Sequence, residues 1–265
     1  MVIVARSRQF LNRPTHSLIQ RLLWSVFGRK LKPVCAQWSV TLPPLNFSDH
    51  PTLCAASPSL LAPPPDWPPA AQVVGDLARA TTDGELDSQI VSFLSDGPPP
   101  IYVGFGSMTV ADPAKIYEVL TGLSHKRRII FARGWSGVNI ESTGNLLAID
   151  RAPHDLLFPQ MVVVVHHGGA GTFHAAARAG VPQVFVSFGG DQKWWAGRAN
   201  AIGIAPPALS ERGLSVGRLD KAIESALMHR VRAREIHEAM KSEDGCRQTH
   251  LAIHRIGSRR DGSTS

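Results

Sequence analysis

Short apolar runs alternate with segments of helical spacing along most of the chain, which is typical of an α/β protein. The clearest run is residues 162–165, four consecutive valines. They are β-branched and apolar on both faces, as a buried parallel strand is. Further apolar runs predict strands at residues 101–105, 128–132, 145–150 and 183–188. We therefore expect a Rossmann-like parallel sheet with helices on both faces.

Apolar residues three and four positions apart predict the helices that accompany these strands. Pro33 is expected to end the first helix, because proline lacks the N–H that a helix interior needs. Prolines cluster between Thr41 and Pro69, which predicts an extended linker. The expected helices cover residues 16–27, 86–94, 112–123, 173–179, 194–201, 215–228 and 231–240.

A glycine-rich turn follows the valine run and leads into the next helix. Three glycines between residues 168 and 171 let a ligand approach the backbone, and Thr172 adds a hydroxyl at the helix start. The first turn of a helix has unpaired N–H groups and a positive dipole end, so it attracts an anion. His167 can donate to a phosphate oxygen. The pattern predicts a diphosphate site; the alternative is a tight turn that His166 and His167 merely cap.

The following predicted strand ends in a polar segment, Gly189-Gly190-Asp191-Gln192. In an open α/β sheet the carboxyl ends of neighbouring strands line one crevice, so Asp191 and Gln192 are expected beside the anion. A carboxylate and an amide suit hydroxyl groups better than phosphate. A diphosphate together with a polyol indicates a nucleotide sugar. Trp194 and Trp195 follow on a helix, where only one of two adjacent residues can face the crevice.

Five motifs occur in this region, in the order P-P-P-I-Y-V-G-F-G-S-M, A-P-H-D-L-L-F-P, H-H-G-G-A-G-T, A-G-V-P and G-G-D-Q-K-W-W-A-G-R. They span residues 98–198. With them the chain resembles the C-terminal, donor-binding half of family 1 glycosyltransferases of the GT-B fold. The resemblance is greatest to the sterol 3-beta-glucosyltransferases, followed by the antibiotic glycosyltransferases of the vancomycin group.

The resemblance implies donor-binding roles at other strand ends. In related enzymes a serine matching Ser107 lies near the donor phosphates; the alternative is a plain turn. Arg151 stands where plant relatives have a tryptophan that stacks on uracil, and a guanidinium plane can also stack on a base. The backbone of Ala152 and the side chain of His154 are expected to contact base and ribose, unless His154 caps the following helix, and Trp135 is a neighbouring wall. The expected donor-binding residues are Gly106, Ser107, Trp135, Arg151, Ala152, His154, His167, Gly169, Ala170, Gly171, Thr172, Asp191 and Gln192.

The resemblance also implies a domain plan and an activity. Residues 1–70 correspond to a remnant of an N-terminal acceptor domain with a linker, residues 71–257 to the donor-binding domain, and residues 258–265 to a disordered tail. The implied activity is inverting transfer of a hexose, glucose from UDP-glucose, to a lipid, a sterol-like compound or another small hydroxylated acceptor.

The base that deprotonates the acceptor has no counterpart in this chain. In the resembling family it is a histidine in a glycine-rich loop of the N-terminal domain, whereas the first apolar residues here lead into Arg6-Ser7-Arg8. A separately encoded acceptor domain would supply it. The alternatives are a non-catalytic nucleotide-sugar-binding domain or a truncated remnant. A dehydrogenase is a weaker third alternative, because Gly104 and Gly106 form only G-x-G and the full dinucleotide-binding motif G-x-G-x-x-G is lacking.

No metal or separate cofactor is expected, the UDP-sugar being the donor substrate. The chain has no D-x-D motif for a metal-bridged donor. His166 and His167 do not suit zinc together with His174, because adjacent residues on a strand point to opposite faces.

Composition narrows the partners and the compartment. The net charge of +7 and pI near 9.8 come largely from arginines at the two ends. Without a nucleic-acid-binding signature, we expect no nucleic acid and at most peripheral membrane contact. Three cysteines without metal-like spacing indicate a reduced, cytoplasmic protein. The apolar run at residues 18–27 is interrupted by Gln20 and Arg21, so we expect neither a signal peptide nor a spanning helix.

Overall fold

The computed structural model describes residues 12–41, 51–77 and 84–261, which group into two compact units. The large unit consists of residues 55–61 and 75–248, and the small unit contains the remainder. The helices are α2 (Asn12–Gln37), α3 (Ser88–Ser95), α4 (Pro113–Ser124), α5 (His154–Leu157), α6 (Ala170–Arg178), α7 (Gln192–Ala201), α8 (Val216–Leu227), α9 (Arg230–Met240) and α10 (Gly245–Asp261). The strands are β1 (Thr52–Cys54), β2 (Ala71–Val73), β3 (Ile101–Gly104), β4 (Ile129–Ala132), β5 (Leu146–Ile149), β6 (Val163–His166), β7 (Gln183–Ser187) and β8 (Leu209–Ser210).

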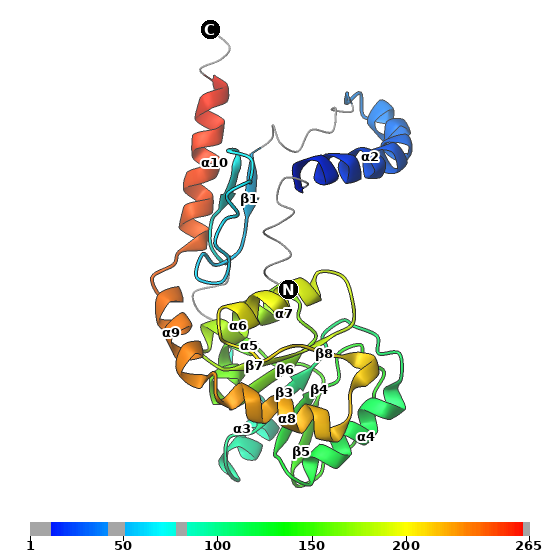
Figure 1. Ribbon diagram of the computed structural model, residues 1–265, viewed down its shortest axis with the longest axis vertical. Helices are drawn as coiled ribbons and strands as arrows, with labels where there is room; N and C mark the ends of the chain where they lie inside the picture. The colour runs from blue at the N-terminus through cyan, green and yellow to red at the C-terminus, as the bar shows by residue number, and fades with distance from the viewer. Residues whose placement is uncertain (1–11, 42–50, 78–83, 262–265) are drawn as a thin grey trace. The chain divides into compact units, whose positions relative to one another are not determined.

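Six parallel strands form the sheet of the large unit, in the order β5-β4-β3-β6-β7-β8 (Figure 1). The valine run forms β6, where Val165 lies opposite Val103 of β3 and Val184 of β7. Every residue of β3, β4, β5, β6 and β7 is buried, because helices cover both faces. The five predicted strands and the Rossmann-like sheet are confirmed.

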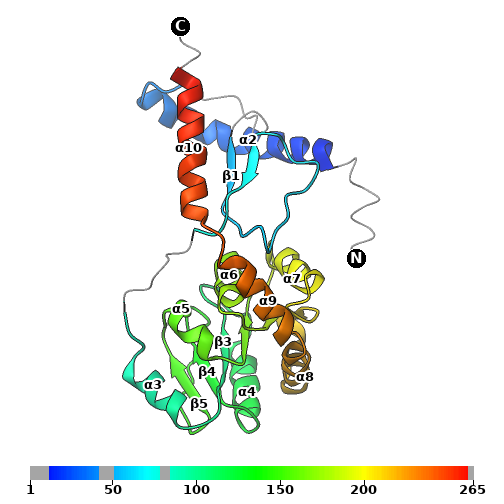
Figure 2. The same ribbon diagram turned by 90° about the vertical axis from the view of Figure 1, so that its left-hand side faces the viewer.

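Alternate residues of the strands contribute to two separate cores. Val103 and Val165 pack with α4 and α8 on one face, whereas Tyr102 and Val164 pack with α3, α5 and α6 on the other. Figure 2 shows α4 and α8 on one side of the sheet and α3 and α5 on the other. A third cluster joins Phe173 of α6 to β7, α7 and α9. The predicted covering of both faces is confirmed.

Two predicted helix boundaries are wrong. Pro33 lies inside α2, which continues to Gln37; proline removes one backbone hydrogen bond, and the 26-residue helix tolerates that loss. The helix after the valine strand begins at Ala170 rather than near Thr172, because Gly169 has extended dihedral angles and is the residue at which the helix starts. Thr172 therefore lies within the first turn.

The proline-rich segment is more structured than a linker. In the small unit β1 and β2 pair in parallel. Residues 55–61 belong to the large unit, where Ser57 and Leu60 are fully buried. The backbone N–H groups of Leu60 and Leu61 both donate to the Ser57 carbonyl, which makes a tight turn. The expectation of an extended linker is wrong for these parts, and residues 42–50 lie outside the described chain.

The C-terminal end is also more ordered than expected. α10 continues to Asp261, so the prediction of a disordered tail is wrong for residues 258–261. Residues 262–265 lie outside the described ranges. Within those ranges, no helix has a stretch that is long and apolar enough to cross a bilayer.

Candidate functional site

The strand order places one break in the winding of the sheet between β3 and β6. From β3 the chain proceeds to β4 and β5 on one side, and then returns to β6, β7 and β8 on the other. In open parallel sheets ligands bind at this point, outside the carboxyl ends of the strands. The residues after β3 and β6 are Gly106 and Ser107, and His167 to Gly171. Two parts of the predicted site therefore lie at the same edge of the sheet, and we call the space outside the ends of β3 and β6 the crevice.

The loops after β3 and β4 are joined through their backbones. The N–H of Trp135 donates to the Gly106 carbonyl at 2.9 Å. A Cβ on Gly134, whose φ is +50°, would lie 2.2 Å from the same oxygen. Glycine is required at residue 134, which we did not predict; a lone glycine after a strand gives little signal. The Trp135 side chain is 72% exposed, so it can form a wall of the crevice.

The imidazole of His167 lies between two glycines of the predicted site. A Cβ on Gly106 would lie 3.1 Å from its Cε1, and one on Gly169 would lie 2.5 Å from its Nε2. The ring is half-buried, and Nδ1 is buried with no hydrogen-bond partner among the described residues. Burial lowers the pKa of His167, and the negative charge of Asp191 partly offsets this shift. Nδ1 of His167 is thus an unused hydrogen-bonding atom inside the loop, whereas Nε2 lies beside Gly169 at the start of α6.

His166 points the other way and is fully buried. The Gly168 N–H donates to its Nδ1 at 3.2 Å, so Nε2 carries the proton and donates to Oε1 of Gln183 at 2.9 Å. Burial, together with the positive charge that His167 can carry, lowers the pKa of His166 to about 3. Each interpretation of the histidine pair therefore fits one residue. His166 stabilises the turn, and His167 is the histidine that can still bind a ligand.

The first turn of α6 is open. Gly169 is its N-cap, and no side chain caps it. A Cβ on Gly171 would meet no atom within 4 Å, and Ala170 and Thr172 are half-exposed. Ser107, after β3, is exposed as well. An uncapped helix start with open space in front of it suits an anion.

Asp191 and Gln192 lie after β7, next to this turn, in different environments. The Asp191 carboxylate is exposed and accepts a 3.1 Å hydrogen bond from Nε1 of Trp195. Gln192 is only 7% exposed; its Oε1 accepts from the N–H groups of Phe188 and Gly189, at 2.8 and 3.1 Å. The carbonyl of Gln192 therefore holds the loop and is not directed to a ligand, whereas Asp191 is accessible.

One further link fastens this loop to the loop after β3. Nε2 of Gln192 lies 3.4 Å from the sulfur of Met108. Sequence patterns gave no reason to single out Met108. Of the two tryptophans, Trp195 packs on Phe173 and His174, whereas Trp194 is 52% exposed, as the helical geometry requires.

The residues predicted to hold the base lie after β5. Arg151 is exposed, and Ala152 packs against the core. The ring of His154 stacks on Phe158, with centroids 4.3 Å apart, and its Nε2 lies 3.5 Å from the Tyr102 hydroxyl. Burial lowers the pKa of His154. The N-cap of α5 is Pro153, so the alternative role of His154 as a helix cap is wrong.

Two cavities lie elsewhere in the described part of the large unit. One of about 710 Å³ is lined by Arg178, His237 and Glu243 among others, and one of about 440 Å³ by residues between Pro206 and Ser225. Within the described chain, no three His, Cys, Asp or Glu side chains are grouped as metal ligands.

Comparison with known proteins identifies relatives of this chain. Residues 136–249 match the model of the erythromycin biosynthesis protein CIII-like C-terminal domain. The chain is 39% identical to a sterol 3-beta-glucosyltransferase of Arabidopsis thaliana over 199 residues, which cover 71% of this chain and 31% of that protein. It is 36% identical to vancomycin aglycone glucosyltransferase of Amycolatopsis orientalis over 174 residues, or 63% and 42% of the two chains. The matched part is thus less than half of either relative.

A solved structure shows the same fold. The glycotransferase of kitacinnamycin superposes with a TM-score of 0.68 at 17% identity, over 92% of this chain and 66% of that one.

Proposed function

We propose that this chain, which belongs to the family 1 glycosyltransferases of the GT-B fold, binds the diphosphate of a nucleotide sugar between β3 and β6 and serves as the donor half of a hexosyltransferase. The observation that carries the proposal is the convergence of His167 and the uncapped start of α6 on one crevice. Nδ1 of His167 has no partner in the described protein, and no side chain caps the start of α6. The exposed hydroxyl of Ser107 lies on the loop whose Gly106 adjoins His167.

These groups are suited to stabilise a leaving diphosphate. When the bond between sugar and diphosphate breaks, negative charge develops on the phosphate oxygens. The N–H groups of Ala170, Gly171 and Thr172 and the helix dipole would stabilise that charge, and His167 would donate a hydrogen bond. This arrangement does not need a metal. Attack on the face of the sugar opposite the leaving group would invert the anomeric carbon.

The sugar and the base are assigned to the neighbouring loops. Asp191, exposed beside His167, would accept hydrogen bonds from hexose hydroxyls. Arg151 and Trp135 offer planar groups for a base. We propose UDP-glucose as the donor, on the similarity to relatives whose names specify glucosyl transfer. A sterol-like or other lipophilic hydroxyl compound is the corresponding acceptor.

The acceptor site and the catalytic base are proposed to lie in a separate N-terminal half. The matched part of this chain is about a third of the first relative. α2 supports this view, because its apolar side chains are more than half exposed and need a partner surface. These side chains are Leu18, Ile19, Leu22, Leu23, Val26 and Phe27. A chain that binds donors without transferring sugar is the alternative, and the same donor residues favour it equally.

Calorimetric titration of the 265-residue chain with UDP and UDP-glucose tests the proposal. We expect saturable binding of both, and at least tenfold weaker binding when His167 and Asp191 are both replaced by alanine. His125→Ala, a change of an exposed histidine at the C-terminal end of α4, serves as the matched control and should bind as the wild type does. Binding of NAD but not UDP would instead favour a dehydrogenase.

Turnover separates the two remaining functions. The chain alone should neither transfer glucose to a sterol nor hydrolyse UDP-glucose, and addition of an N-terminal half from a sterol glucosyltransferase should restore transfer. Donor binding without any restored transfer favours the non-catalytic alternative.

A further inference from the structure

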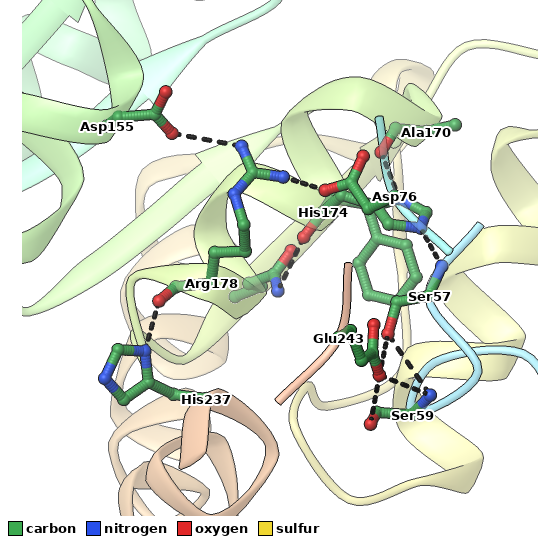
Figure 3. A network of polar contacts seen from close by, with 11 residues as sticks. Ser57, Ser59, Asp76, Asp155, Ala170, His174, Arg178, His237 and Glu243 are labelled. Carbon is green, nitrogen blue, oxygen red and sulfur yellow. Dashed lines mark hydrogen bonds and ion pairs between the residues drawn. The ribbon is translucent and has the colours of Figure 1, made fainter. Parts of the chain in front are cut away.

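His174, on the inner side of α6, links the diphosphate turn to a distant segment of the chain. It is 3% exposed. The backbone N–H of Ser57 donates to its Nε2 at 3.1 Å, so that nitrogen carries no proton. The proton is therefore on Nδ1, which donates to the Ala170 carbonyl at 2.7 Å. Figure 3 shows the imidazole between Ala170 and Ser57.

A single carboxylate fixes the segment that His174 contacts. Oε1 of Glu243 accepts hydrogen bonds from the Ser57 hydroxyl at 2.9 Å, the Ser59 hydroxyl at 2.6 Å and the Ser59 N–H at 3.1 Å. Ser57 is fully buried and lies 117 residues from His174 in the sequence. Ser57 is thus held both by its own tight turn and by Glu243, which follows 186 residues later in the sequence.

The other end of α6 is held by a different set of contacts. The Arg178 guanidinium pairs with Asp76 and, at 3.0 Å, with Asp155. The Arg178 carbonyl accepts a hydrogen bond from His237. These contacts secure the C-terminal end of the nine-residue helix and do not touch its first turn.

We propose that His174 is a positioning residue for the donor site. By bonding to both Ser57 and Ala170, it holds the first turn of α6 in a fixed position relative to the Ser57 segment. The reason is the geometry of one peptide unit. The Ala170 carbonyl and the Gly171 N–H belong to the same planar, trans peptide group. Holding the Ala170 oxygen therefore also fixes the direction of the Gly171 N–H, which points outward at the N-terminal end of α6. The expected effect on donor binding rests on the proposed function, whereas the positioning of the first turn of α6 does not.

Two substitutions separate the two hydrogen bonds of His174. His174→Asn keeps an amide near the site of Nδ1 but cannot reach Ser57, and His174→Gln places its amide near the site of Nε2 and gives up the bond to Ala170. Glu243→Ala removes the three hydrogen bonds from this segment to Glu243 without changing a residue of α6. Asp76→Asn is the matched control, because it weakens an ion pair at the far end of the same helix.

Hydrogen exchange of the Phe173 amide, which donates to the Gly169 carbonyl at 3.0 Å across the first turn of α6, measures the positioning directly, without a ligand. We expect this amide to exchange at least fivefold faster in His174→Asn, His174→Gln and Glu243→Ala, with Asp76→Asn like the wild type. The dissociation constant of UDP, measured on the same proteins, should rise about fivefold in the first three only, a change of the size expected for one weakened hydrogen bond. Thermal unfolding identifies any variant that fails to fold. If one of the three test variants does so, the remaining two decide the outcome.

The outcomes are distinguishable from failure of the proposed function. If the wild type does not bind UDP, the proposed function fails, and hydrogen exchange still decides the positioning. Wild-type exchange in both His174→Asn and Glu243→Ala would overturn the inference. So would a change of equal size in Asp76→Asn, because that would indicate general loosening of α6.

Discussion

The two sides of α6 use the same kinds of groups in opposite ways. On the inner side, both ring nitrogens of His174 are bonded, to Ala170 and Ser57. On the crevice side, Nδ1 of His167 is buried without a partner in the described chain, and no side chain caps the helix. A buried polar group without a partner costs free energy, typically 1–3 kcal/mol. The contrast indicates that the inner side builds the structure and the crevice side is left for a ligand.

His166 and His167 repeat this contrast between adjacent residues. His166 is bonded to Gly168 and Gln183 and is fully buried. His167 is half-buried between Gly106 and Gly169. The predictions below test whether the bonded groups determine stability and the open ones determine ligand binding, beginning with the largest expected effect.

The largest effect is expected from Gly134→Ala. An alanine there would have a φ of +50° and a Cβ 2.2 Å from the Gly106 carbonyl. Strain and steric overlap together should lower the free energy of unfolding by about 3 kcal/mol. Urea denaturation measures it. Gly144→Ala, where a Cβ would meet nothing within 4 Å, is the control and should change stability little.

The second-largest effect is expected from acidification, which should destabilise the protein through the buried His166. The pKa of His166 is about 3 in the folded protein, below the ordinary value of 6.5, so the unfolded chain binds the proton more tightly. This contribution to stability is complete above pH 6.5 and is lost as the pH falls towards 3. His166 alone should therefore reduce the free energy of unfolding by about 2 kcal/mol between pH 7 and pH 5.

Denaturation of the wild type and of His166→Asn at both pH values checks this expectation. The variant should be less stable at pH 7 but should lose less stability on acidification. An equal loss in the two proteins would show that His166 is not the group responsible. The pKa values of His154, His167 and His174 are also lowered by burial and act in the same direction.

A substitution on the crevice side should change ligand binding and leave stability largely unchanged. His167→Ala should weaken UDP binding about tenfold, because one hydrogen bond to a charged phosphate is lost. Its free energy of unfolding should not fall by more than about 0.5 kcal/mol, because Nδ1 loses no hydrogen bond within the described chain and the cost of burying it unpaired is removed. Calorimetry and denaturation measure the two quantities. A large loss of stability with unchanged affinity would reverse the assignment.

Gly171→Ala should give the smallest effects, in opposite directions. A Cβ at this helical position meets nothing within 4 Å, so alanine should stabilise the protein by about 0.5 kcal/mol. The same methyl group would stand in front of the helix start and should weaken UDP binding about threefold. If stability rises and affinity is unchanged, the phosphate does not approach residue 171.

Sequence patterns were sufficient for five of the six strands of the sheet, because β3 to β7 are buried and largely apolar; β8, which is two residues long and partly exposed, was not predicted. The valine run and the runs pairing with it on either side, at residues 101–105 and 183–188, give strong signals. The glycine-rich turn and His167 could be recognised for a similar reason, since they follow a strand and precede a helix. Helix ends were harder: the loss of one hydrogen bond at Pro33 did not end α2.

Contacts between distant segments could not be predicted. Nothing in the local pattern indicates that Ser57 lies against His174, or that Glu243 holds both Ser57 and Ser59. The inward orientation of Gln192 depends on the loop conformation, because its carbonyl accepts from backbone groups three and four residues earlier. Sequence spacing suggested a polar pair; the structure separates an accessible Asp191 from a buried Gln192.

The most direct measurement is the amide NMR spectrum of the chain as UDP is added. If the diphosphate binds at the start of α6, the signals of Ala170, Gly171 and Thr172 should shift most and saturate together, with those of Asp76 and Arg178 unchanged. UDP binding that leaves these three signals in place, or that shifts another region instead, would contradict the central claim.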